Sequence, residues 1–435
     1  MITTVLSFLL VLGVLIFIHE LGHFIAARHV GVKVEAFSIG FPPTALSKKI
    51  GETKYIISWV PIGGYVKLFG QNVTDENKND PTNYASKSIL QRLYILIAGP
   101  LMNLLFALIF MPIVFWMGVD IPAYLKNKPF IQKVEISSYA DKLGLAANDK
   151  IISINGNYVN SWETLNNILN QISPSEKFSL EFERAGNSFI IEGSAIKMHR
   201  AGQMGWSPKI APIVGGFTQN SPAKNGGIQS GDIIKKINGQ QILDWSEISP
   251  EIQKIMKVNK TNKEKIFIEL ERKGEPLFKE VLPYFEEDSQ KWFLGMRIQN
   301  ISRSHSFKDS LILGIERLLF LTKSTFNFLG QMIIGDGSVD DLGGPIKIGI
   351  VIGEAVRSSL VDLFFLMSFI SLQLGIFNLL PIPALDGGHI FMLLLEKLKG
   401  GPLSKSAREK TQLVGFSILI SLMIFVTWND VMGLL

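Results

Sequence analysis

The residues His19-Glu20-Leu21-Gly22-His23 place three ionisable side chains close together in an apolar segment. On an α-helix, residues four apart lie on one face, about 6 Å apart along the axis. Two histidines at this spacing can bind one Zn²⁺ ion at about 2.0–2.1 Å each. Glu20 would then lie beside the metal, where its carboxylate can take a proton from water. The motif predicts a hydrolytic zinc site.

The surroundings of the motif favour this interpretation over a chance match. The apolar run begins at Val5 and continues past the motif to Ala27, which is long enough to span a membrane. Ionisable side chains at a bilayer centre cost roughly 2.5–3.5 kcal/mol each on insertion scales, so their presence needs a functional reason. The run lacks a basic leader and a small-residue cleavage site, so we expect no cleaved signal peptide.

A catalytic zinc site needs a third protein ligand and one open position. The chain has no cysteine, so the ligand must be His, Asp or Glu. His29 lies about 15 Å along an unbroken helix from His19, so we expect it to be a basic residue at the membrane face. Asp386 is the better candidate, because Gly387 and Gly388 follow it and let the backbone approach closely. Alternatively, Asp386 could cap the following helix.

The composition predicts a polytopic membrane protein. Of 435 residues, 47% are hydrophobic and 19% are charged, against about 25% charged in soluble proteins. The stretch 311–334 carries three charged residues, so we expect an interfacial amphipathic helix there. Four apolar runs have about the 17–25 residues that a bilayer requires, namely 5–27, 93–119, 360–380 and 413–428.

Basic residues predict the orientation of these spans. Residues 28–92 carry nine Lys or Arg and residues 384–411 carry five, whereas residues 1–4 carry none. By the positive-inside rule, both basic loops are cytoplasmic and both termini lie outside. The third span then ends on the same side as the two histidines, which favours Asp386 as the third ligand. We attribute the net charge of +5 to this orientation, not to nucleic-acid binding.

The long segment between the second and third spans contains an internal repeat. Residues 139–156 are echoed at 222–239, with matches that include Asp149 with Asp232 and Asn155-Gly156 with Asn238-Gly239. A short helix, a turn, an apolar strand and an Asn-Gly turn fit this pattern. Two copies predict two similar folded units, because a solenoid needs at least three.

The paired motifs at His19–His23 and Asn378–Gly387, with four spans and a tandem repeat, resemble the site-2 protease family of intramembrane metalloproteases. The resemblance covers nearly the whole chain. It implies that His19, His23 and Asp386 hold Zn²⁺ and that Glu20 is the general base. It also implies that Asn378 helps to hold the substrate or the oxyanion. An Asn in a span can alternatively form hydrogen bonds between helices.

The resemblance implies an α-helical polytopic membrane protein with four transmembrane helices, a membrane-associated β-sheet and two tandem PDZ-like α+β domains. The expected order is a first transmembrane helix with the His-Glu motif (1–28), a cytoplasmic loop with the sheet (29–92), a second helix (93–119), the first PDZ-like domain (120–205), the second (206–300), periplasmic amphipathic helices (301–358), a third transmembrane helix (359–382), a cytoplasmic loop with the Leu-Asp-Gly motif (383–411), and a fourth helix with the C-terminus (412–435).

Side chains of residues 55–69 alternate in the pattern typical of a β-strand, and Gly63-Gly64 interrupts this pattern. Sheet edges are not tolerated against lipid, but they can line a polar cavity. We hypothesise that this sheet binds the substrate as an added strand, since a peptide bond inside a helix is protected from attack. The alternative is an ordinary cytoplasmic hairpin.

The implied function is regulated intramembrane proteolysis in the bacterial inner membrane, with the active site near the cytoplasmic side and the PDZ-like domains in the periplasm. The expected partners are the lipid bilayer, single-span proteins such as anti-sigma factors, and remnant signal peptides, but no nucleic acid. The resemblance also implies that another protease makes a first cut and that the PDZ-like domains exclude bulky substrates. The rival hypotheses are a membrane-anchored scaffold with a structural metal and a zinc transporter. We expect His199 and His305 at the surface; His389 either supports Asp386 or lies at the membrane interface.

Overall fold

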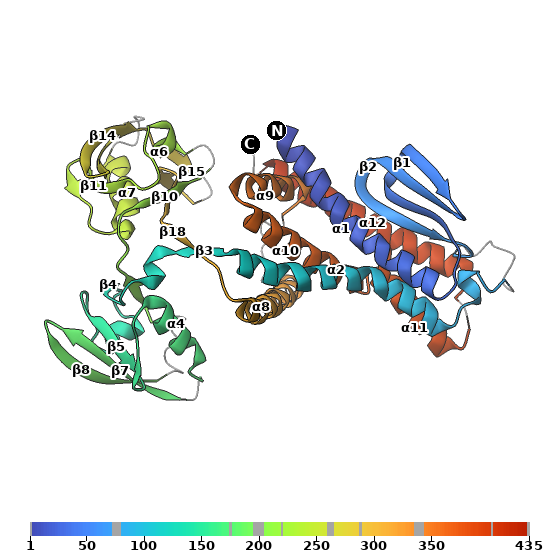
Figure 1. Cartoon of the computed structure of the whole chain (residues 1–435), viewed down its shortest axis with the longest axis horizontal. Helices are drawn as coiled ribbons and strands as arrows, with labels where there is room; N and C mark the ends of the chain where they lie inside the picture. Colours follow the sequence, from blue (N-terminus) through green and yellow to red (C-terminus); the bar gives the residue numbers. More distant parts are fainter. Residues whose placement is uncertain are drawn as a thin grey trace. The chain divides into compact units, whose positions relative to one another are not determined.

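The computed structural model describes residues 2–71, 80–173, 176–194, 204–218, 221–258, 265–286, 289–334, 343–401 and 403–432, so His199 lies outside the described residues. The chain divides into two compact units (Figure 1). Unit 1 contains Met1–Val119 and Ser304–Leu435, and unit 2 contains Asp120–Arg303.

Within the described residues, four helices of unit 1 are long and apolar enough to cross a membrane. The number of candidate spans agrees with the predicted four. The second helix begins four residues earlier than the predicted span, because Ser88 and Gln91 form a capping box in front of it. The four helices are α1 (Ile2–His29), α2 (Ile89–Met117), α10 (Leu360–Leu379) and α12 (Lys405–Met432).

Helix α2 packs against both α1 and α10. Two serines of α10 donate hydrogen bonds to carbonyl groups of α2: Ser371 Oγ to Asn103 at 2.8 Å, and Ser368 Oγ to Ala107 at 3.0 Å. Small residues allow membrane helices to approach closely, and their hydroxyl groups bond across the contact. The part of α2 that contains Asn103 and Ala107 is therefore bonded directly to α10.

The expected amphipathic helix is present as α8 (Phe307–Ile334) and is not among the candidate spans. Its Leu318 packs with Met111 of α2 and Leu372 of α10, so one face of α8 covers the spanning helices. A second helix, α9 (Pro345–Ser358), follows it. Asp430 of α12 accepts hydrogen bonds from backbone N–H groups at the start of α9, which satisfies donors that a helix N-terminus leaves unpaired.

The predicted strand around Gly63-Gly64 is part of a sheet built from β1 (Val34–Ile50) and β2 (Thr53–Leu68). Both strands bend, so residues 36–39 of β1 have partners on two sides, 54–57 and 64–67. Among the described residues, segment 64–67 pairs only with β1. This segment is therefore an edge of the sheet.

Unit 2 contains two copies of one fold, as the repeat predicts. The first copy has a four-stranded sheet with the order β6-β5-β7-β8, and the second has the order β12-β11-β13-β14. Their sheets and helices are β5 (Lys150–Ile154), β6 (Asn157–Tyr158), α4 (Trp162–Gln171), β7 (Lys177–Arg184) and β8 (Asn187–Ser194), then β11 (Ile233–Ile237), β12 (Gln240–Gln241), α7 (Ile248–Val258), β13 (Ile266–Arg272) and β14 (Glu275–Val281).

Each copy also has a short strand pair and a one-turn helix at the start of the repeat. The first copy extends to Pro208, three residues beyond the expected boundary, because Trp206 packs on its core and its strand pairs with β4. These elements are β4 (Ile131–Val134), α3 (Tyr139–Lys142) and β9 (Trp206–Pro208), then β10 (Val214–Phe217), α6 (Pro222–Asn225) and β17 (Met296–Ile298), with β15 (Tyr284–Glu286) and β16 (Lys291–Phe293) before β17. The strands β3 (Val119–Pro122) and β18 (Asn300–Arg303) pair with each other.

The repeated aspartate has the same role in both copies. Arg184 donates two hydrogen bonds to the buried Asp149, at 2.6 and 2.7 Å, and Arg272 donates two to Asp232, both at 2.7 Å. Burial alone would raise the pKa of Asp232, but the hydrogen bonds from Arg272 hold it below its ordinary value. The sequence repeat therefore reflects a shared buried ion pair as well as a shared sheet.

Candidate metal centre

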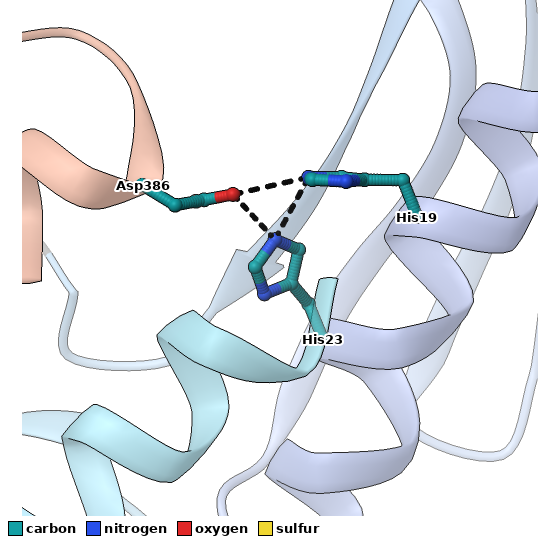
Figure 2. Close-up of side chains that lie close together, drawn as sticks. All are labelled: His19, His23 and Asp386. Carbon is teal, nitrogen blue, oxygen red and sulfur yellow. Dashed lines mark hydrogen bonds and ion pairs between the residues drawn. The ribbon is translucent and has the colours of Figure 1, made fainter. Parts of the chain in front are cut away.

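Three side chains that are predicted to hold a metal meet in unit 1 (Figure 2). Nε2 of His19 lies 3.1 Å from Oδ2 of Asp386, and Nε2 of His23 lies 3.4 Å from the same oxygen. The two Nε2 atoms are 3.2 Å apart. The structure thus brings Asp386 to two histidines that precede it by more than 360 residues in the chain.

The His23 ring is oriented by α2. Its Nδ1 donates a hydrogen bond to the carbonyl oxygen of Ile95 at 2.8 Å, so in the neutral ring Nε2 carries no proton and can bind a metal at the centre. Gly99 provides the space for this ring, because a Cβ atom there would lie 2.2 Å from Nε2 of His23. Any larger residue at position 99 would displace the ring.

Nδ1 of His19 faces α2 as well. It lies 3.2 Å from Nδ2 of Asn103, a residue with no exposed surface in the middle of α2. Asn103 is not among the site residues predicted from the sequence, because the second span was interpreted as an apolar helix. A polar amide within such a span is itself a signal that could have identified it.

Asp386 is positioned by the start of α11 (Asp386–Lys399). The N-cap residue of this helix is Leu385, so the alternative role of Asp386 as an N-cap is wrong. Gly387 permits a close backbone approach, because a Cβ atom there would lie 2.1 Å from the carbonyl oxygen of Leu380. The carboxylate is consequently directed at the two histidines instead of at its own helix.

The far end of α11 is held by a buried ion cluster. The Glu396 side chain is only 6% exposed, forms an ion pair with Arg408 of α12, and lies 3.9 Å from Arg92 of α2. It also accepts a hydrogen bond from the backbone N–H of Leu403 at 3.1 Å. Because a buried carboxylate needs such partners, this cluster sets the position of the helix that begins with Asp386.

A cavity of about 440 Å³ adjoins the three side chains. Glu20 and Asn378 line it, as do His389 and segment 63–66 of β2. The Glu20 carboxylate faces the backbone N–H of Val66, at the edge of the sheet. The predicted general base and the predicted substrate-binding strand therefore share one cavity.

The remaining predicted residues have distinct positions. Asn378 donates a hydrogen bond to the carbonyl of Leu374 in its own helix at 3.0 Å, and its side chain lines the cavity. His29 lies 3.2 Å from the Tyr94 hydroxyl, at the end of α1 and away from the three ligand candidates. His305 is half-buried beside the Phe115 ring.

The three candidate ligands fit a zinc ion. Four ligands at about 2.0–2.1 Å in a tetrahedron are about 3.3 Å from one another. The three observed distances, 3.1, 3.2 and 3.4 Å, match this value. Oδ2 of Asp386 is also buried and has no hydrogen-bond partner of standard geometry among the described residues. Two imidazoles and a carboxylate are a donor set typical of catalytic zinc sites.

The family model of peptidase family M50 matches residues 7–422. This chain belongs to peptidase family M50. Several curated bacterial relatives are similar over nearly their full length. The regulator of sigma E protease of Haemophilus influenzae is 33% identical over 98% of both chains. RseP, the regulator of sigma-E protease of Escherichia coli, is 30% identical over 98% of this chain and 97% of its own.

Another relative, from Pasteurella multocida, is named as a zinc metalloprotease and is 31% identical over 98% of both chains. Among solved structures, the PDZ domain of an SdrC-like protein from Listeria monocytogenes is 14% identical and covers 21% of this chain and 90% of its own, with a TM-score of 0.18. Membership of family M50, the named relatives and the four spanning helices show that the chain is a membrane zinc metalloprotease of the site-2 protease type.

Proposed function

We propose that the chain binds one zinc ion through His19, His23 and Asp386 and hydrolyses a peptide bond in the transmembrane segment of single-span proteins. The observation that carries this proposal is the convergence of three ligand atoms within 3.1–3.4 Å of one another, beside Glu20 and at a cavity. When bound, zinc supplies Lewis-acid polarisation of the scissile carbonyl and lowers the pKa of a water molecule.

In this mechanism, Glu20 is the general base. Its carboxylate takes a proton from the attacking water and passes it to the amine that leaves. Asn378, on the cavity wall, is placed to donate a hydrogen bond to the substrate backbone or to the oxyanion. The test is cleavage of a single-span substrate by the purified chain; a protein that contains stoichiometric zinc but cuts no such substrate would support the scaffold hypothesis.

We further propose that segment 64–67 of β2 binds the substrate as an additional strand. Segment 64–67 pairs only with β1 among the described residues, so its other side can accept a peptide strand; the N–H of Val66 faces the Glu20 carboxylate there. An extended substrate exposes its peptide bonds, whereas a helix encloses them. Strand addition would therefore unwind the substrate beside the metal.

Substitution of Val66 by Pro is expected to abolish cleavage and to leave zinc binding unchanged, because proline removes the N–H donor from the edge. Val66→Ala, which keeps this donor, is the matched control and should still cleave. Turnover of a single-span substrate and zinc content are measured on both variants. Unchanged turnover by Val66→Pro would argue against strand addition and favour an ordinary hairpin.

The two repeats of unit 2 are proposed to be PDZ-like domains that act as a size-exclusion gate. The internal repeat and the two matching sheets support two similar modules. In the proposed orientation the chain lies in the bacterial inner membrane, with the metal centre near the cytoplasmic side and unit 2 in the periplasm. Anti-sigma factors and remnant signal peptides, trimmed by an earlier protease, are the proposed substrates.

The gate hypothesis predicts a difference between trimmed and untrimmed substrates. We expect the full chain to cleave a single-span substrate with a short outer tail and to spare the same span with a folded outer domain. A chain that lacks residues 120–303 is expected to cleave both. The cleaved fraction of each substrate is measured in proteoliposomes. Equal cleavage of both substrates by the full chain would contradict the gate.

A further inference from the structure

The two candidate histidine ligands differ in what faces the ring nitrogen that points away from the centre. A histidine that binds a metal through one ring nitrogen carries its proton on the other, and that N–H needs an acceptor. Nδ1 of His23 has one, the carbonyl oxygen of Ile95 at 2.8 Å. Nδ1 of His19 instead faces the Nδ2 atom of Asn103, at 3.2 Å.

As placed, the Asn103 amide cannot serve a metal-binding His19. Nε2 of His19 faces the centre, so Nδ1 must carry the proton. An amide NH₂ group donates hydrogen bonds and does not accept them, so two donors would face each other. At the same time, Oδ1 of Asn103 is buried and has no hydrogen-bond partner among the described residues.

A half-turn of the amide removes the conflict between the two donors and gives Oδ1 a partner, while Nδ2 moves to the position that Oδ1 leaves. The oxygen and nitrogen of an Asn side chain occupy nearly equivalent positions, and their assignment follows from the hydrogen bonds around them. After the half-turn, Oδ1 lies where Nδ2 is now, within hydrogen-bond distance of Nδ1 of His19. The backbone of Asn103 is meanwhile held by α10, because its carbonyl accepts the hydrogen bond from Ser371 at 2.8 Å.

We propose that Asn103 is a positioning residue of the metal centre. Its Oδ1 accepts the Nδ1–H of His19, which holds the imidazole in the tautomer and ring orientation that present Nε2 to the zinc ion. This inference rests on the proposed function as a zinc protease. Helix α2 would then orient both histidines. The carbonyl of Ile95 would accept the Nδ1–H of His23, and the amide oxygen of Asn103 would accept that of His19.

The alternative is that Asn103 only joins spanning helices. The two roles predict different results for the substitution Asn103→Asp. Asp has almost the shape of Asn and keeps an acceptor oxygen, but it loses the NH₂ donor. A support for His19 is preserved by Asn103→Asp, because a carboxylate accepts the Nδ1–H as well as an amide oxygen does. A role in packing alone predicts no change in zinc affinity with Leu or Ala, provided that the chain folds.

The test is the zinc dissociation constant of the purified full chain in detergent, measured by competition with a chelator of known affinity. We expect Asn103→Leu and Asn103→Ala to bind zinc about 10–100-fold more weakly, the usual loss when the partner of a ligating histidine is removed. Asn103→Asp is expected within about tenfold of wild type or tighter. Ser368→Ala, which removes a neighbouring bond between α10 and α2, is the control and should match wild type.

Wild-type affinity in both Asn103→Leu and Asn103→Ala would overturn the proposal, and so would an Asn103→Asp variant as weak as these two. Size-exclusion profiles identify any variant that has not folded, and Asn103→Ala replaces Asn103→Leu if the larger side chain is not accommodated. If wild type itself binds no zinc, the proposed function fails. If wild type binds zinc and the Asn103 variants bind it equally well, only the positioning role fails.

Discussion

Substitution of Glu20 by Gln is expected to reduce peptide cleavage by at least about 10²–10⁴-fold, the usual contribution of a general base, while zinc remains bound. Gln has the shape of Glu but no basic oxygen that can take a proton from water. Glu20 lines the cavity and is not one of the three residues whose ligand atoms converge. Its substitution should therefore affect proton transfer and not metal binding.

The measurement is turnover of a single-span substrate together with zinc content per chain, on wild type and on Glu20→Gln. Glu316→Gln, on α8 and outside the cavity, is the matched control and should cleave at the wild-type rate. Full turnover by Glu20→Gln would exclude Glu20 as the base. Loss of zinc from this variant would indicate that the carboxylate has a structural role at the centre.

Asp386→Asn is expected to weaken zinc binding by more than about 100-fold, above the range for removing a supporting group, and to abolish cleavage. The substitution removes the negative charge of the ligand set, and a neutral amide oxygen is a poorer ligand for zinc than a carboxylate. The loss of zinc affinity should be larger than for any Asn103 variant, because Oδ2 of Asp386 is itself a candidate ligand atom. It lies 3.1 and 3.4 Å from the two histidine nitrogens.

Zinc affinity by chelator competition separates this variant from its control, Asp362→Asn. Asp362 is the acidic residue in the first turn of α10, where it bonds with Ser358 and Ser359 away from the centre. We expect wild-type affinity in Asp362→Asn. Zinc binding by Asp386→Asn that equals wild type would remove Asp386 from the ligand set and would require another third ligand.

The sequence was sufficient to predict the spans and the meeting of the three ligand candidates. Long apolar runs identify spans by length alone, and the spacing of His19 and His23 places them on one helix face. Asp386 could be placed near the two histidines because basic residues indicate on which side of the membrane each loop lies. Only residues near the same side can form one site. These inferences use properties of single segments.

Most contacts between segments could not be predicted from the sequence. Asn103 is 84 residues from His19, and no local pattern indicates that its amide faces that ring. The bends that give residues 36–39 of β1 partners on two sides depend on the packing of the whole hairpin. The cluster of Glu396 with Arg92 and Arg408 joins three helices whose charged ends are each ordinary in sequence. Such features follow from tertiary packing and need the structure.

The central claim, zinc-dependent cleavage within a membrane span, is tested most directly by fragment masses. The purified chain is incubated with a single-span substrate before chelation, after removal of the metal, and after re-addition of zinc, and the products are weighed by mass spectrometry. We predict two fragments that join inside the span, none after chelation, and recovery with zinc. Cleavage that persists without metal, or fragments that join only outside the span, would contradict the account.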